Sequence, residues 1–136
     1  MEVLSYVLSD SLYVDFVLQT VKQLLEHHGN ELSTDVLLHS DRGFQYTGKP
    51  FCTRLKKHHR MKQSMSRVAH CIDNGPMEGF WGILKREMYY GKKITSKGDL
   101  ITAVESYIRY YNTERIQRKM HLMTPAEFHD HFDAAA

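Results

Sequence analysis

An apolar strand that ends abruptly on polar residues is the feature that most restricts the fold of this chain. Residues 35–40 read DVLLHS, and Asp41, Arg42 and Gly43 follow directly. Continuous hydrophobicity over a few residues is typical of a strand buried on both faces, in a parallel sheet covered by helices. Ligands and chemistry collect at the carboxyl ends of such strands. We therefore expect an α/β fold with Asp41 at a functional edge of the sheet.

The rest of the sequence predicts further strands and helices in alternation. The segment 2–9, EVLSYVLS, is short, apolar and β-branched and is predicted as a strand, and MKQSMS at 61–66 as another short one. The predicted helices run from a cap at Asp10 or Ser11 to Gly29, over 47–59 with Pro50 in the first turn, over 73–90, over 96–112, and from Thr124 and Pro125 onward. This order indicates an α/β chain, and we expect one domain over residues 1–136.

Helical spacing also predicts which side chains are buried. In the helix over 73–90, Met77, Phe80, Trp81, Leu84 and Met88 recur on one face. The following helix opens with a capping box of Ser96 and Asp99, and most of its aromatic group is expected in the core. The residues predicted to be buried on this helix are Leu100, Ala103, Val104, Tyr107, Ile108 and Tyr111. The alternative for the aromatic group Tyr107, Tyr110 and Tyr111 is stacking on bases.

Charge is distributed very unevenly along the chain. Residues 1–41 hold one basic residue and seven acidic ones, whereas residues 42–72 hold eight basic residues and no acid. Such a segment either binds a polyanion, since Lys and Arg contacts to phosphate dominate nucleic-acid affinity, or forms a solvated helix face.

Two acidic residues are candidates for a divalent-metal site. Asp41 follows the apolar strand, and Glu78 lies in the first turn of a predicted helix, with 36 residues between them. Paired carboxylates on Mg²⁺ or Mn²⁺ can organise phosphoryl transfer. The alternatives are that Asp41 caps a turn and that Glu78 favours the positive end of its helix.

Three strings give the sequence a family resemblance. HSDRGFQYT, KQSMSRVAHCIDNGPMEGFWGILKREMYY and YIRYYNTERIQRKMHLMTPAEF closely resemble the catalytic core of IS3-type insertion-sequence transposases, which belong to the retroviral-integrase-like superfamily. The resemblance implies a ribonuclease H-like fold with a mixed sheet flanked by helices. It also implies that Asp41 and Glu78 are the second and third acids of a metal-binding Asp-Asp-Glu triad, one residue further apart than is usual in that family.

The resemblance further implies that the first acid of the triad, with the first two strands, precedes this chain. Asp10 and Asp15 stand at a predicted helix start and are interpreted as helix-capping residues. We expect only weak binding of magnesium or manganese without the first acid. The missing strands would leave an unpaired sheet edge, which predicts a homo-oligomer such as a dimer.

DNA is the expected partner, and the DNA-binding residues come from the basic segment and from the resembling strings. The resemblance places SMSR and Asn74 near the site. The expected DNA-binding residues are Arg42, Lys49, Arg54, Lys56, Lys57, Arg60, Lys62, Ser64, Ser66, Arg67, Asn74 and Lys85.

Composition excludes several other classes of protein. No apolar run is long enough to span a membrane, and the start of the chain lacks a signal sequence, so we expect a cytoplasmic protein with no membrane partner and no small-molecule cofactor. The resemblance to insertion-sequence transposases implies that the cytoplasm is bacterial. Cys52 and Cys71 form no disulfide framework, and the residues His58, His59 and His70 lack zinc-ligand spacing. Two function classes remain: a DNA transposase, complete or in part, and a non-catalytic nucleic-acid-binding or self-associating remnant of one.

Overall fold

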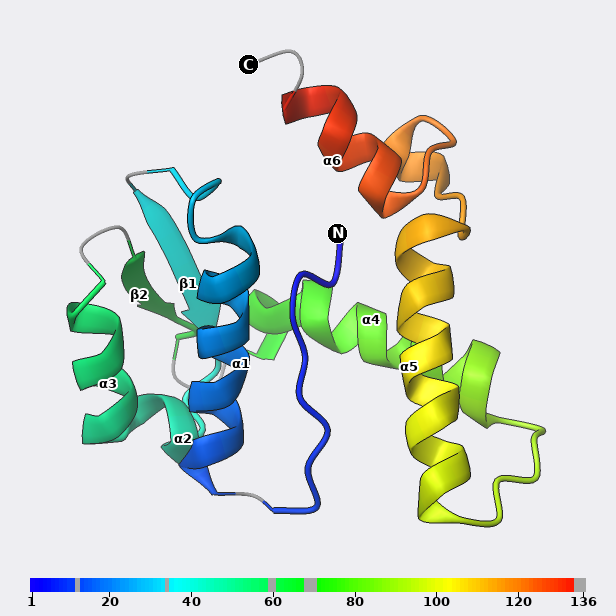
Figure 1. The fold of residues 1–136 in the computed structure, drawn as a ribbon, viewed down its shortest axis with the longest axis horizontal. Coiled ribbons are helices and arrows are strands. Elements are labelled where there is room, and N and C mark those ends of the chain that lie inside the picture. The colour runs from blue at the N-terminus through cyan, green and yellow to red at the C-terminus, as the bar shows by residue number, and fades with distance from the viewer. Residues whose placement is uncertain (12, 34, 59–60, 68–70, 134–136) are drawn as a thin grey trace. The chain divides into compact units, whose positions relative to one another are not determined.

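The computed structural model describes residues 1–11, 13–33, 35–58, 61–67 and 71–133. The chain divides into two compact units, one of Leu4–Met77 and one of Met1–Val3 with Glu78–Ala136. Figure 1 labels the elements, which in chain order are α1 (Val14–His28), β1 (Val36–Ser40), α2 (Phe44–Thr47), α3 (Lys49–Lys56), β2 (Met61–Met65), the 3-10 turn η1 (Cys71–Asn74), α4 (Gly75–Leu84), the π-helix η2 (Lys85–Tyr89), α5 (Lys97–Thr113), the 3-10 turn η3 (Arg118–Met120) and α6 (Pro125–Asp133). No helix in the described ranges is long and apolar enough to cross a membrane.

The unit of Leu4–Met77 is built on two parallel strands, β1 and β2. Their register pairs Val36 with Met61 and Ser40 with Met65, which confirms both the parallel arrangement and the short strand predicted at MKQSMS. Helices α1 and α3 supply most of the core of this unit, which consists of Val17, Val21, Phe51, Leu55 and Met61. Pro50 lies in the first turn of α3, as predicted, where its missing N–H costs nothing.

Strand β1 is buried on one face only, which corrects the prediction that both faces are covered. Val36 and Leu38 pack against the apolar cluster of this unit, whereas the side chain of Leu37 is 64% exposed. Alternation is the expected pattern for a strand with one covered face. The apolar sequence therefore predicted the strand correctly but not the number of its covered faces.

The predicted strand at 2–9 is wrong, because these residues have no regular secondary structure. Their polar groups hydrogen-bond to a side chain and to a helix carbonyl, and not to a neighbouring strand. Asn112 donates to the Val3 carbonyl at 2.8 Å and accepts from the Val3 N–H at 3.0 Å, and the Ser5 hydroxyl donates to the Thr20 carbonyl at 3.2 Å. Backbone groups bound in this way do not require a neighbouring strand.

Helix α1 also begins later than predicted. Its N-cap is Tyr13, which makes no side-chain capping bond, whereas Asp10 and Ser11 precede the helix. Asp15 stands in the first turn, where its charge suits the positive end of the helix. Gly29 is the C-cap, as predicted, and its N–H donates to the Leu25 carbonyl at 3.0 Å.

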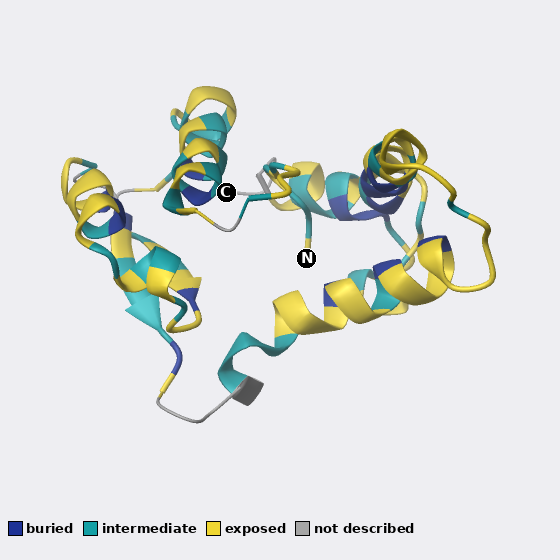
Figure 2. Cartoon of the chain, turned by 90° about the horizontal axis from the view of Figure 1, so that it is seen from below, coloured by how far each residue is buried: buried dark blue, intermediate teal, exposed yellow. Residues whose placement is uncertain are grey.

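The unit of Glu78–Ala136 is helical, with a core along one face each of α4, η2 and α5. Its buried residues are Phe80, Leu84, Met88, Val104, Tyr107, Ile108 and Tyr111. Figure 2 shows the buried residues on single helix faces, with exposed residues opposite. Trp81 and, in the first turn of α4, Met77 are 43% and 47% exposed, so their predicted burial is wrong, as it is for Leu100. On α4 and α5 the row of apolar residues is therefore wider than the part of the helix that is buried in the core.

Two capping predictions in this unit are confirmed. The Ser96 hydroxyl accepts from the Asp99 N–H at 3.0 Å at the start of α5. At the start of α6, Thr124 accepts from the Glu127 N–H while the Glu127 carboxylate accepts from the Thr124 N–H. This reciprocal pair satisfies two N–H groups that a helix start leaves without partners.

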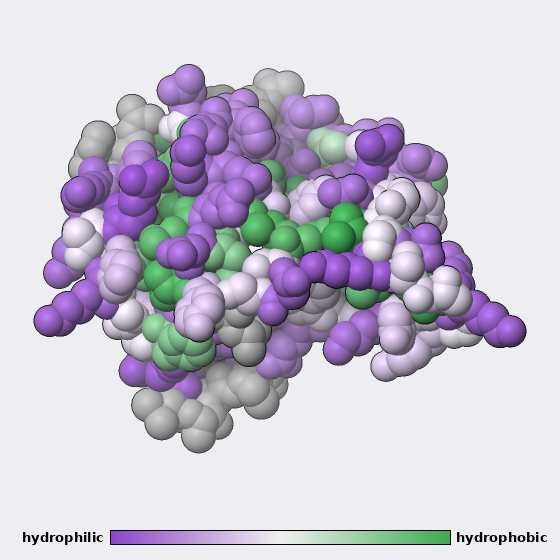
Figure 3. All heavy atoms as spheres, turned by 60° about the horizontal axis from the view of Figure 1, so that its bottom comes forward, coloured by the Kyte–Doolittle hydropathy of each residue, from purple (hydrophilic) through white to green (hydrophobic). Residues whose placement is uncertain are grey.

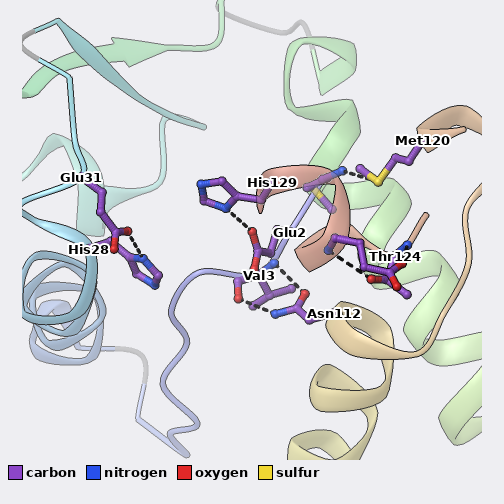
Figure 4. Close-up of polar contacts among 10 residues, drawn as sticks. Glu2, Val3, His28, Glu31, Asn112, Met120, Thr124 and His129 are labelled. Carbon is purple, nitrogen blue, oxygen red and sulfur yellow. Dashed lines mark hydrogen bonds and ion pairs between the residues drawn. The ribbon is translucent and has the colours of Figure 1, made fainter. Parts of the chain in front are cut away.

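The first residues of the chain are tied to α5 and α6. Figure 4 shows the paired bonds of Val3 with Asn112 and the contact of the Glu2 carboxylate with His129 Nδ1 at 2.6 Å. The Met1 amino group lies 3.9 Å from the sulfur of Met120. Burial lowers the pKa of this amino group. These contacts place Met1–Val3 in the carboxyl-terminal unit.

Candidate metal and nucleic-acid site

Asp41 lies directly after β1, at the carboxyl end of the sheet, and is exposed. Its Oδ1 accepts a hydrogen bond from the Gly43 N–H at 2.8 Å. The aspartate therefore caps a turn, as one of the two interpretations proposed. A carboxylate has about four acceptor positions, so this bond is compatible with metal binding through the others.

The pKa of the Tyr46 hydroxyl is raised by its environment at this edge. Burial is the larger cause, and the negative charge of Asp41 is the second. Its ring packs edge-on against Phe51, with 5.4 Å between centroids. The tyrosine thus keeps its proton and joins the strand-end turn to the core of the unit.

His39 is a residue of this edge that the sequence reasoning did not select. Its Nδ1 lies 2.9 Å from the Ser64 hydroxyl oxygen and its Nε2 lies 3.2 Å from that of Ser66. One ring nitrogen of a neutral histidine donates and the other accepts, so the two serines can be bridged in either tautomer. The register that pairs His39 with Ser64 creates this contact. The predicted DNA ligands Ser64 and Ser66 therefore already hold the ends of β1 and β2 together.

The sheet register also continues past the last residue of β2. The Ser66 N–H donates to the Ser40 carbonyl at 2.9 Å, and Arg42 Nε donates to the Ser66 carbonyl at 2.9 Å. Arg42 thus lies across the carboxyl ends of both strands, next to Asp41. The structure brings these residues together at the edge where Asp41 was expected.

Two of the predicted phosphate contacts have carboxylate partners. Arg67 Nη2 and Nε bind the two oxygens of Asp73 at 2.9 and 3.0 Å, and this pairing raises the pKa of the Arg67 guanidinium. Lys62 binds Asp35, and this bond lowers the pKa of the Asp35 carboxyl. A cation that already has a carboxylate neighbour attracts a phosphate less strongly. Lys62 and Arg67 are therefore weaker DNA candidates than the sequence suggested.

The other predicted DNA ligands are distributed over several elements. Lys49, Arg54 and Lys56 are exposed on α3, and Lys57 is its exposed C-cap. Asn74 is half-buried at the end of η1, and Lys85 is exposed at the start of η2. Arg60 lies outside the described residues.

Glu78 lies in the first turn of α4 and is exposed, and it belongs to the carboxyl-terminal unit. This position suits a carboxylate, because the end of a helix carries partial positive charge. Among the residues that the structure describes, no group of three or more His, Cys, Asp or Glu side chains could hold a metal ion. Cys52 is a free thiol, and His59 and His70 lie outside the described ranges.

A second carboxylate network, around Glu87, was missed by the sequence reasoning. Arg115 donates from Nη2 to Glu87 Oε1 at 2.7 Å and from Nε to Oε2 at 2.9 Å, and the Tyr107 hydroxyl donates to Oε2 at 2.8 Å. The bond from Arg115 lowers the pKa of the Glu87 carboxyl, and burial raises the pKa of Tyr107. The network joins η2 to the end of α5.

Comparison with known proteins identifies several similar chains. Residues 78–132 match the model of the Integrase core domain family. A putative transposase for insertion sequence IS150 of Escherichia coli (strain K12) is 39% identical over 129 residues, which cover 93% of this chain and 44% of the relative. An uncharacterized transposase-like protein of Haemophilus influenzae is 41% identical over 92 residues, 68% of this chain and 42% of the relative.

A transposase for insertion sequence IS3A of Escherichia coli is 33% identical over 95 residues, which cover 69% of this chain and 33% of the relative. The chain thus spans less than half the length of these three relatives. No solved structure matches the chain.

Proposed function

Because the chain belongs to the insertion-sequence transposases and carries a segment of an integrase core domain, we propose that it forms part of an enzyme that cleaves and joins DNA. The observation that supports this proposal most directly is the position of Asp41, exposed at the carboxyl end of a parallel strand beside Arg42. Parallel strands collect functional groups at that end. The ribonuclease H-like fold of the complete protein is part of the same proposal.

In this proposal Asp41 and Glu78 hold Mg²⁺ or Mn²⁺. A bound divalent ion supplies charge stabilisation for phosphoryl transfer and lowers the pKa of the attacking hydroxyl. The side chains contribute oxygen ligands, and Arg42 holds a phosphate beside them. The nucleophile, water or a 3′-hydroxyl, would release its proton to solvent and form a bond to phosphorus, while the P–O bond on the opposite side breaks and the leaving oxygen takes up a proton from solvent.

A second candidate function is a non-catalytic, DNA-binding or self-associating form of the same fold. The observation that favours it is the lack, in the described part of the chain, of three grouped metal-ligand side chains. With two carboxylates, much of the coordination of the ion would fall to water, which weakens its binding. We therefore expect weak metal binding by this chain and no strand transfer.

Metal binding can be tested by titrating manganese into the labelled protein and measuring paramagnetic broadening. We expect broadening around Asp41 and Glu78 that is lost in an Asp41→Asn, Glu78→Gln variant and kept in Asp15→Asn, which changes an exposed acid elsewhere. Unchanged broadening in the double variant would remove the two carboxylates from the proposal. Manganese-dependent nicking of insertion-sequence end DNA, abolished by Glu78→Gln, would instead show that the chain is catalytic by itself.

We also propose that the chain self-associates as a dimer or higher oligomer. In the described part of the chain β1 pairs with β2 alone, so its other edge is open, and open strand edges pair readily with other chains. Light scattering over a range of micromolar concentrations tests this. A mass of 15.9 kDa throughout would show a monomer and exclude the association.

A further inference from the structure

A groove between α1 and α3 is a feature of the Leu4–Met77 unit that the proposed catalytic site does not use. It has a volume of about 470 Å³, and its lining includes Leu18 and Lys22 from α1 and Lys49, Pro50, Arg54 and Lys57 from α3 and its C-cap. Four of these side chains are cations, and two, Leu18 and Pro50, are apolar. The groove is thus a concave surface with one sign of charge.

The charge of this groove is largely uncompensated. Lys22 Nζ lies 3.6 Å from Glu26 Oε1, and both side chains are exposed on α1. The other three cations, Lys49, Arg54 and Lys57, make no ion pair with another described residue, and they belong to the acid-free segment 42–72. Unpaired cations on a concave surface concentrate negative charge from solution.

The cations on or beside the strands are more often paired than those of the groove. Lys62, near the start of β2, is paired with Asp35, and Arg67, just after β2, is paired with Asp73. The basic segment therefore has two parts that its sequence does not distinguish: cations paired with carboxylates on or beside β2, and unpaired cations on α3 and its C-cap. Figure 3 shows, on one face of the molecule, how hydrophilic side chains surround exposed apolar ones.

We infer that the groove between α1 and α3 binds the phosphodiester backbone of duplex DNA, an inference that rests on the proposed DNA function. Arg54 and Lys57 are separated by about 4.5 Å along the helix axis, comparable to the axial spacing of about 3.4 Å between phosphates of one strand. Leu18 and Pro50 offer apolar contacts to the sugars. The groove lining contains no aromatic ring on which the bases of a single strand could stack, so a duplex fits better.

The inference predicts that DNA affinity depends on the groove and much less on the paired cations. The test measures fluorescence anisotropy of a short labelled duplex of arbitrary sequence over a range of salt concentrations. The groove variant is Arg54→Ala with Lys57→Ala, and the matched control is Lys62→Ala with Arg67→Ala, which removes two charges from the same segment. Circular dichroism checks that each variant folds, and Lys22→Gln with Lys49→Gln serves as a second groove variant.

We expect the groove variant to lose affinity on the order of tenfold at low salt, and its log–log salt slope to fall by about two, because each phosphate contact contributes about 0.9. The control should change the slope by less than half as much. If the parent chain binds the duplex, and the groove variant loses no more affinity than the Lys62→Ala, Arg67→Ala control, the groove inference is overturned while the DNA function stands.

If the parent chain does not bind duplex at all, the DNA function itself fails for this chain. Binding of poly-glutamate in place of DNA, lost in the groove variant, would assign the groove to an acidic protein and overturn the inference.

Discussion

The carboxylate of Glu87 should contribute measurably to the stability of the carboxyl-terminal unit. It accepts bonds from both Arg115 and Tyr107, and replacing it by glutamine keeps its size while removing its charge. Hydrogen bonds to charged groups contribute about 1.5–3 kcal/mol when well protected. The side chain of Glu87 is 37% exposed and that of Arg115 24%, so solvent screening reduces the expected loss in Glu87→Gln to about 1–2 kcal/mol.

The assay is urea unfolding at neutral pH, followed by the fluorescence of Trp81, the one tryptophan of the chain, which lies in the same unit. A double-mutant cycle of Glu87→Gln with Arg115→Met isolates the coupling between the two side chains. Glu105→Gln, an exposed acid on α5, is the matched control. In a thermal melt, each kcal/mol lost from the free energy of unfolding should lower the melting temperature by about 4 °C.

The contribution of Glu87 also depends on pH, with a defined sign. Because the folded state lowers the pKa of this carboxyl below its ordinary value of 4.5, the stabilisation is complete above that value. It is lost as the pH falls through the lowered, folded-state pKa. The difference between parent and Glu87→Gln should therefore shrink in acid. A coupling energy below about 0.3 kcal/mol, or a loss no greater than that of Glu105→Gln, would refute the role of this network.

Two further variants test the amino-terminal unit. Phe51 is fully buried, so Phe51→Ala should lower the free energy of unfolding by about 3–5 kcal/mol through lost contacts and a cavity. A circular dichroism melt measures this loss, and a loss below about 1 kcal/mol would show that neighbouring side chains fill the space left by the ring. Asp35→Asn removes the exposed partner of Lys62 and should leave the melting temperature unchanged while increasing the affinity for duplex DNA at low salt; an unchanged affinity would place Lys62 away from the bound DNA.

Local sequence signals predicted the parts of the fold that depend on neighbours in sequence. The predicted caps Ser96 and Thr124 each accept from the N–H of a residue three positions on, and the place of Pro50 in the first turn of α3 follows from the fixed φ of its ring. The apolar run before Asp41 predicted a parallel strand correctly, although the strand is covered on one face and not on both, as such a run suggests.

Predictions that depended on distant partners were less successful. Residues 2–9 have the composition of a strand, yet they lie beside Asn112 and Thr20, whose positions no local pattern indicates. Trp81 is apolar and at helical spacing, but the contact face of α4 runs through Phe80 and Leu84.

The candidate site shows the same division between local and distant information. The sequence selected Asp41 from the residues around it, but it could not show that Asp73 and Asp35 accompany Arg67 and Lys62. The bridge from His39 to Ser64 and Ser66 follows from the strand register. That register becomes known only once the two strands are paired.

The π-helix at Lys85–Tyr89 has a consequence for comparing this chain with its relatives. A π-helical turn holds about one residue more than an α-helical turn, as though a single residue had been inserted into an ordinary helix. Relatives in which this turn is α-helical should be one residue shorter here, and an alignment should place its gap inside 85–89. Deleting one residue there should restore the α-helical phase, whereas a deletion within α5 would rotate every later side chain away from its partner.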